Sequence, residues 1–125
     1  MIASAGFLFI FSLSSASVNF TNSDTAKGVE IPEDVQAVLD NSCYGCHNSE
    51  SQNEKAREKI SFDKLNDLKT FALIGTLEGI QETVESAKMP PEKFLKKYPD
   101  NALSDAHKKT LLDWASETAD KLAGE

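Results

Sequence analysis

The sequence predicts an all-α protein. Apolar residues recur every three or four positions through most of the chain after residue 31, which is the spacing of one helix face. No segment alternates apolar and polar residues as a half-buried strand does, and there is no internal repeat. With 125 residues, 40% of them apolar and 26% charged, the chain has the length and composition of one globular domain with one modest core.

The first predicted helix begins at the stretch IPED, Ile31 to Asp34. Proline suits a first helical turn, and acidic side chains favour the positive end of the helix dipole. The helix ends near Ser42, and its apolar face comprises Val35, Val38 and Leu39. The polar segment from Asn48 to Lys59 has no periodicity and is predicted as a surface loop.

Two further helices are expected in the middle of the chain. Ser61 suits the N-cap of a short helix, and a longer helix then runs to about Lys88. Their apolar positions are Phe62, Leu65, Leu68, Phe71, Ile74, Leu77, Ile80 and Val84. The Pro-Pro pair that follows blocks a helix, so Met89–Leu103 is predicted as a loop with one turn around Phe94.

The last predicted helix has Ser104 as its N-cap and ends at Gly124, two residue types that favour these positions. Its apolar residues fall on one face at helical spacing. They are Leu111, Trp114, Ala115, Thr118 and Leu122.

The N-terminal segment has the layout of a secretory signal. It carries no charge, and an apolar run from Ala5 to Leu13 is followed by small residues, with cleavage expected after Ala16 or Ser17. No Lys or Arg precedes the run, and an uncleaved anchor is the alternative, but the run is shorter than the roughly 20 residues that a membrane-spanning helix needs. Cleavage would give an exported, for example periplasmic, protein. The predicted division is a signal peptide, a linker and one domain, at residues 1–17, 18–30 and 31–125.

Cys43, Cys46 and His47 form the pattern Cys-x-x-Cys-His within the stretch SCYGCHN. This pattern is the attachment signature of c-type haem. Two thiols three positions apart, at the end of a helix, can form thioethers with the two vinyl groups on one edge of a porphyrin. The histidine that follows then lies under the iron as its proximal ligand. Gly45 is expected to ease the tight turn between the cysteines.

Three alternatives compete with haem attachment. A redox pair of the thioredoxin type belongs beside a βαβ pattern, and no strand precedes Cys43. A disulfide between such close neighbours would close a very short loop, which gains little stability. A zinc site would use four ligands, Cys43, Cys46, His47 and His107. The direct adjacency of Cys and His departs from the usual zinc spacings, so haem is favoured.

A six-coordinate haem iron needs a second ligand on its other face. Met89 is the only methionine besides Met1, and it stands immediately before Pro90, which holds it on a stiff, extended loop. The alternatives are a buried methionine that fills the core, and His107 as the ligand in its place. Core methionines usually lie on periodic helix faces, so Met89 is our predicted distal ligand.

The chain resembles the monohaem c-type cytochromes, and more narrowly it is similar to the small exported haem-binding domain family of Bacteroidetes-type bacteria. The matching pieces are VQAVLDNSCYGCHN, KMPP and LSDAHKKTLLDWA, which spread over nearly all of residues 31–122. The resemblance implies a cytochrome c-like fold of about four helices around one covalently attached haem. It also implies attachment at Cys43 and Cys46, with His47 and Met89 as the proximal and distal iron ligands.

The resemblance further implies that the last helix crosses the first one. Trp114 would then meet Val35 and Leu39 and shield the pocket. Many members of the narrower family carry a tryptophan-rich stretch soon after the haem histidine, whereas residues 48–59 are polar here.

Gly75 and Gly79 lie four residues apart on one side of a predicted helix, and each costs about 1 kcal/mol relative to alanine. Close approach of this helix to a neighbour or to the porphyrin would explain them, and weak selection for helix stability is the alternative. The pocket walls are expected from apolar residues of the same region. These residues are Phe62, Phe71, Ile74 and Leu77.

Histidine and methionine on the two sides of the iron would leave no open position for oxygen or peroxide. The predicted function is therefore electron transfer by one covalently attached haem c, in a protein that is not an enzyme. One alternative is a haem-based sensor or weak peroxidase with an exchangeable distal ligand. The other is a haem module of a larger redox complex.

Charge is distributed unevenly along the chain. Thirteen Lys and Arg against 20 Asp and Glu give a net charge of -7, which argues against nucleic acid as the main partner. From residue 88 to residue 98, however, four lysines stand against Glu92 alone, for a local charge of +3. This basic segment is predicted to dock an acidic redox partner. Its lysines are Lys88, Lys93, Lys96 and Lys97.

Overall fold

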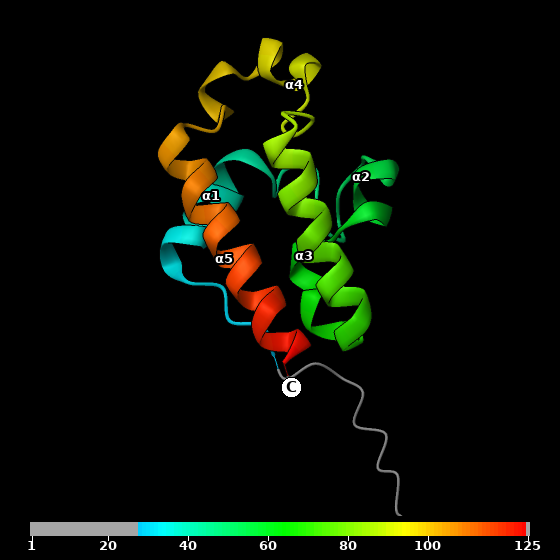
Figure 1. The fold of residues 1–125 in the computed structure, drawn as a ribbon. Coiled ribbons are helices and arrows are strands. Elements are labelled where there is room, and N and C mark those ends of the chain that lie inside the picture. Colours follow the sequence, from blue (N-terminus) through cyan, green and yellow to red (C-terminus); the bar gives the residue numbers. More distant parts are fainter. Residues whose placement is uncertain (1–27, 125) are drawn as a thin grey trace, which may run out of the picture.

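The computed structural model describes residues 28–124, and the elements of these residues are all helices. The elements are α1 (Glu33–Ser42), α2 (Glu54–Lys59), η1 (Phe62–Asp67), α3 (Thr70–Glu85), α4 (Glu92–Lys97), η2 (Pro99–Asn101) and α5 (Asp105–Ala123) (Figure 1). No β-strand occurs within these residues, which confirms the predicted all-α class. None of their helices combines the length and hydrophobicity of a membrane-spanning segment. The predicted signal peptide, residues 1–17, lies outside the described residues.

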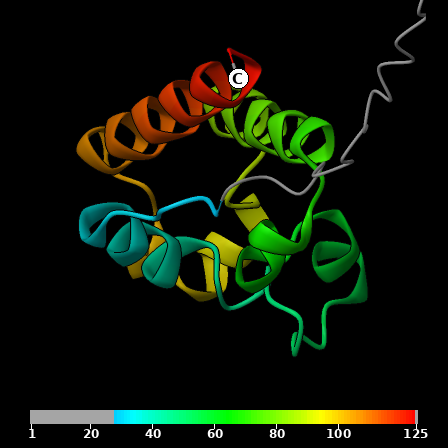
Figure 2. The ribbon, with the colours of Figure 1, turned by 90° about the horizontal axis from the view of Figure 1, so that it is seen from below.

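The two long helices, α3 and α5, run antiparallel and form the most extensive contact of the fold, and α1 packs against α5 (Figure 1). Seen from below, α3 and α5 lie together along one edge, with α1 across the core from α3 (Figure 2). A single apolar core joins these helices to η1. Its most deeply buried side chains are Leu39, Leu65, Leu73, Leu77 and Leu111.

The chain enters the core before α1 begins. Val29 is buried, and its backbone N–H donates to the Asn66 side-chain oxygen of η1. The indole N–H of Trp114 donates to the Glu30 carbonyl at 3.1 Å, which ties α5 to the segment before α1. As predicted, α1 has acidic residues in its first turn and an apolar face turned to the core.

The segment predicted as a loop after the motif contains a helix, α2, so that part of the prediction was wrong. The Asn53 side chain caps α2 by accepting the Ala56 N–H at 3.2 Å, and Arg57 donates to the Ser51 carbonyl at 2.8 Å. The six residues of α2 include no buried side chain. Because α2 rests on caps and side-chain hydrogen bonds, it leaves no apolar periodicity in the sequence.

Two details of the middle helices also differ from the prediction. The Ser61 hydroxyl does not cap the short helix, which is a 3₁₀ helix; it donates to the Arg57 carbonyl instead. Phe71 is 89% exposed, whereas Leu73 is fully buried. The buried positions of α3 follow the helical period from Leu73, and Phe71 falls outside that face.

The C-terminus of α3 is a Schellman motif. The N–H of Lys88 donates to the Thr83 carbonyl at 2.9 Å and the N–H of Ala87 to the Val84 carbonyl at 3.1 Å. Ala87 has a φ of 54°, in the left-handed region that favours glycine. The Met89 N–H also donates to the Thr83 carbonyl, at 3.1 Å, so the end of α3 fixes the backbone of Met89.

The predicted loop from Met89 to Leu103 holds two short helices, α4 and η2, which cross from the end of α3 to the start of α5 (Figure 1). The Asn101 side chain donates to the Asn41 carbonyl, and the Asn41 side chain donates in return to Asp100, so η2 is tied to the end of α1. Ser104 caps α5 by accepting the His107 N–H at 3.1 Å, as predicted.

We expect Ala87→Gly to raise the free energy of unfolding by about 0.5–1 kcal/mol, because glycine relieves the left-handed strain although it gains entropy in the unfolded chain. Chemical denaturation of the variant and the native chain measures this difference. Ala106→Gly, at an exposed helical position of α5, is the matched control and should lower stability. A loss of stability in Ala87→Gly would contradict the left-handed helix end.

Candidate functional site

One large cavity, of about 820 Å³, is enclosed between α2, α3 and α4 and the turn after α1. Its volume lies in the range of small-molecule and cofactor pockets. Its walls bring together the four residues predicted to hold haem, although they are up to 46 positions apart in the chain. These residues are Cys43, Cys46, His47 and Met89.

The Cys-x-x-Cys-His motif begins where α1 ends. The N–H groups of Cys43 and Tyr44 both donate to the Leu39 carbonyl, at 2.9 and 2.7 Å. The N–H groups of Cys46 and His47 then donate to the Cys43 carbonyl, at 3.1 and 3.0 Å, so the motif folds into a continuous turn. No glycine in the described part of the chain has a positive φ, and a Cβ on Gly45 would meet no atom within 4 Å. Neither backbone strain nor lack of space therefore requires the glycine, contrary to our expectation.

His47 is held on three sides. Its carbonyl accepts the Phe62 N–H at 3.1 Å, and its ring meets the Phe62 ring edge to face, with centroids 6.2 Å apart. The ring Nδ1 lies 3.0 Å from the Ala56 carbonyl and 3.3 Å from that of Ile60, at the end of α2. Carbonyl oxygens can only accept, so Nδ1 carries the proton and Nε2 keeps a free lone pair. This is the second-sphere arrangement that orients histidine ligands of metals.

The two thiols are free, so no disulfide joins Cys43 and Cys46. The environment of the thiols also does not favour a redox dithiol or a zinc site. Burial, and to a lesser degree the neighbouring Cys46, raises the pKa of the Cys43 thiol to about 11. A redox dithiol reacts as a thiolate, which this environment disfavours. Within residues 28–124 no group of three or more His, Cys, Asp and Glu side chains could hold a metal ion, so the four-ligand zinc site is not formed.

Met89 lies on the cavity wall beyond the end of α3, and its side chain is 37% exposed. It is thus not a buried core methionine. His107, the alternative ligand, does not line the cavity. Its Nδ1 is buried, with no hydrogen-bond partner among the described residues, one turn into α5.

Small side chains of α3 form one wall of the cavity, at positions spaced three or four residues apart. These residues are Ala72, Gly75, Thr76, Gly79 and Thr83. A Cβ built on Gly75 or Gly79 would meet no atom within 4 Å, so neither glycine serves close helix packing. Both leave open space on the cavity wall instead, so of the two close approaches that the sequence offered, only that of a porphyrin fits them.

The other predicted walls are only partly correct. Phe62 lines the cavity, whereas Phe71, Ile74 and Leu77 do not. Trp114 lies in the core as expected but does not line the cavity; Leu111, one turn earlier on α5, does. Sequence reasoning also missed Ile60, Leu103 and Tyr98 as lining residues, because irregular segments carry them and no periodic pattern marks them.

The basic segment around α4 is less uniform than its sequence suggests. Lys88 pairs with Glu82 at 3.6 Å, and Lys96 pairs with Glu92 at 2.8 Å. These exposed pairs lower the net positive charge that the segment offers to an acidic protein. The other two lysines of the segment line the cavity.

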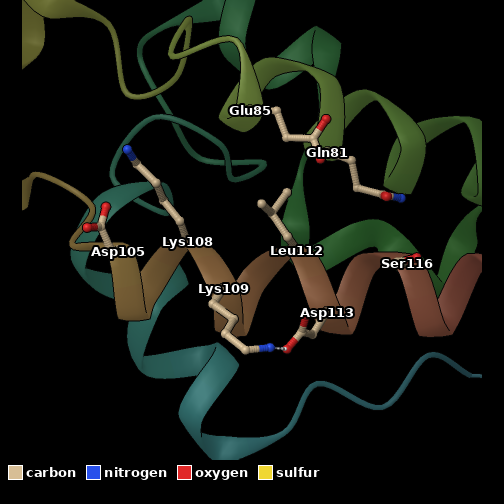
Figure 3. Close-up of a pocket in the computed structure, with 8 residues that line it drawn as sticks. All are labelled: Gln81, Glu85, Asp105, Lys108, Lys109, Leu112, Asp113 and Ser116. Carbon is tan, nitrogen blue, oxygen red and sulfur yellow. Dashed lines mark hydrogen bonds and ion pairs between the residues drawn. The ribbon is translucent and has the colours of Figure 1, made fainter.

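A second hollow, of about 490 Å³, lies between α3 and α5 and is open to solvent (Figure 3). Gln81 and Glu85 reach into it from α3, and Leu112 points toward them from α5, while Lys109 and Asp113 pair with each other. Its lining has no His, Cys or Met side chain. The groove therefore offers none of the side chains that were predicted to bind haem iron.

A comparison with known protein families identifies a cofactor. A family model described as a haem-binding domain matches residues 50–117, which is more than half of the chain. The match covers α2, α3, α4 and most of α5 and begins three residues after His47. No curated protein and no solved structure matches the chain.

The cavity fits the cofactor that the family model names. The glycine wall leaves space beside α3, and the carbonyl groups hold the His47 ring through Nδ1, which leaves Nε2 for an iron. Aromatic and aliphatic side chains supply most of the remaining surface, as an extended apolar macrocycle requires. They are Ile60, Phe62, Ile80, Val84, Phe94, Tyr98, Leu103 and Leu111.

We expect Gly79→Leu to lower haem content at least about tenfold, because a leucine side chain would occupy the cavity and overpacking costs typically 1–3 kcal/mol. The ratio of haem absorbance to protein concentration measures the effect. Glu78→Leu, an exposed position on the same helix outside the cavity, is the matched control and should load normally. Normal loading of Gly79→Leu would contradict this wall as the cofactor site.

Proposed function

This chain belongs to the haem-binding domain family, and we propose that it carries one covalently attached haem and transfers single electrons. Cys43 and Cys46 would provide the thioether bonds, with His47 and Met89 as the two axial ligands. When bound, haem supplies a one-electron couple between ferric and ferrous iron. The four residues line one cavity, which supports the proposal.

The proposal rests above all on the hydrogen bond from His47 Nδ1 to the carbonyl groups at the end of α2. This bond fixes both the tautomer and the ring orientation, and it leaves Nε2 for a metal. A histidine whose only role was packing would not need its ring proton directed at two carbonyl groups on one side. The hydrogen bond also makes the imidazole more electron-rich, because the carbonyl oxygen draws the proton.

Met89 would complete the coordination from the opposite wall. The Thr83 carbonyl already fixes its backbone, so iron binding would cost only the rotamer entropy of the Met89 side chain. Thioether ligation raises the reduction potential relative to two histidines. With both axial positions taken by side chains, the protein would serve as an electron carrier and not as an enzyme.

Export is the other part of the proposal. The uncharged apolar run and the small residues within 1–17 support it, and the mature chain would then work in the periplasm or elsewhere outside the cytoplasm. Attachment through two thioethers would keep the cofactor on a protein that has left the cytoplasm. An acidic redox protein is the proposed partner, docking near the basic segment around α4.

One observation favours a second function. The end of α3 holds Met89 by a hydrogen bond to its backbone, so its thioether could leave the iron and open a position for a small molecule. The protein would then be a haem-based sensor or a weak peroxidase. Carbon monoxide separates the two functions, because a carrier with a firmly held Met89 resists it and a sensor binds it readily.

We expect the exported protein to be heavier than its polypeptide by the mass of one haem. Cys43→Ala and Cys46→Ala should each keep the cofactor through one thioether, and the double variant should lose it on denaturation. Intact-mass measurement after denaturation checks this, with Ser49→Ala as a control outside the cavity. A wild-type chain that releases all its haem on denaturation would rule out covalent attachment.

Met89→Ala should lower the reduction potential by on the order of 0.1 V, part of the ~0.8 V range over which axial ligands set haem potentials. It should also let carbon monoxide bind the ferrous protein. Redox titration and the visible spectrum measure both effects. His107→Ala should change neither, since His107 lies off the cavity wall, and the reverse pattern would assign the distal position to His107.

A further inference from the structure

The charged side chains on the cavity wall all have the same sign. They are Lys59, Lys93 and Lys97, and none of the described lining residues is Asp or Glu. This is unexpected by composition, because acidic residues outnumber basic ones 20 to 13 in the chain. The three lysines are exposed and therefore stand at the edge of an otherwise apolar cavity, where their summed positive potential suits a ligand with negative charge.

Two of these lysines stand together on α4. Lys93 and Lys97 are four residues apart on one helix, which brings their side chains to the same face, and like charges at this spacing repel. Neither forms an ion pair within the described part of the chain, whereas Lys96 of the same helix has its Glu92. The Lys97 ammonium lies 5.2 Å from the centre of the Tyr98 ring, which orients it without neutralising it.

We propose that Lys93 and Lys97 bind the two carboxylate groups that haem carries on one edge. This inference rests on the proposed haem binding and adds which residues of α4 select and orient the ligand. An ammonium beside each carboxylate would offset the like-charge repulsion on α4 and form a charge-assisted hydrogen bond. These two lysines then serve the cofactor, although the sequence placed them in a partner-docking segment.

A ligand with blocked carboxylates tests the pairing directly. The full chain is produced without haem attachment and titrated with hemin and with hemin dimethyl ester, which lacks both negative charges. Lys93→Gln/Lys97→Gln should bind hemin about tenfold more weakly and should bind the ester as the native chain does. Lys55→Gln/Lys121→Gln removes the same charge at exposed positions off the cavity and should leave both affinities unchanged.

Each outcome decides the question. An equal loss of affinity for hemin and for the ester would mean that the lysines stabilise α4 and do not bind the carboxylates. An unchanged hemin affinity would mean that the lysines are available to bind a protein partner. Either result overturns the inference. If hemin fails to bind the native chain at all, the proposed function itself fails.

A second measurement uses the haem-loaded protein, in case the unloaded variant does not fold. A zero-length carbodiimide joins a carboxylate and a neighbouring amine as an amide, with loss of water. We expect a cross-linked peptide in which the haem carboxylate is joined to Lys93 or Lys97, found by mass spectrometry. Cross-links to other lysines alone would overturn the inference while leaving haem binding intact.

Discussion

The hydrogen bonds from the His47 ring to the Ala56 and Ile60 carbonyls are the interaction on which the rest of the site depends. Through its ring and its carbonyl, this one residue joins the turn after α1 to the end of α2 and to the start of η1. The Ala56 carbonyl also accepts the Ile60 N–H at 3.1 Å, so the imidazole adds a second hydrogen bond at the C-terminal turn of α2. The same bonds therefore orient the proposed iron ligand and hold α2, a part of the cavity wall, beside it.

The parts of the fold that could be predicted from the sequence are those determined by residues close together in the chain. The start of α1 and the N-cap of α5 follow from Pro32 and Ser104, and the apolar period marks the buried faces. The helix α2 could not be predicted, because its stability comes from the Asn53 cap and from a contact with His47 made only in the folded chain. Its polar sequence could equally be that of a loop, because no apolar pattern in it distinguishes a helix from a loop.

The site shows the same division. Cys43, Cys46 and His47 lie within five consecutive residues, so their pattern could be recognised from the sequence without knowledge of the tertiary structure. Leu111 and Trp114 lie on the same side of α5, and only the rotation of that helix decides which of them borders the cavity. The hydrogen bond from the Trp114 indole to Glu30 fixes that rotation. Likewise, the sequence alone could not say whether Gly75 and Gly79 serve close helix packing, and the open space beside both shows that they do not.

The Schellman motif at the end of α3 connects the two sides of the cavity within one stretch of chain. The carbonyl of Thr83 holds the Met89 backbone, and Thr83 belongs to the same helix as the small-residue wall. The position of the Met89 backbone relative to the small-residue wall is thus set within one helix end, and it does not depend on the length of the connection between α4 and α5.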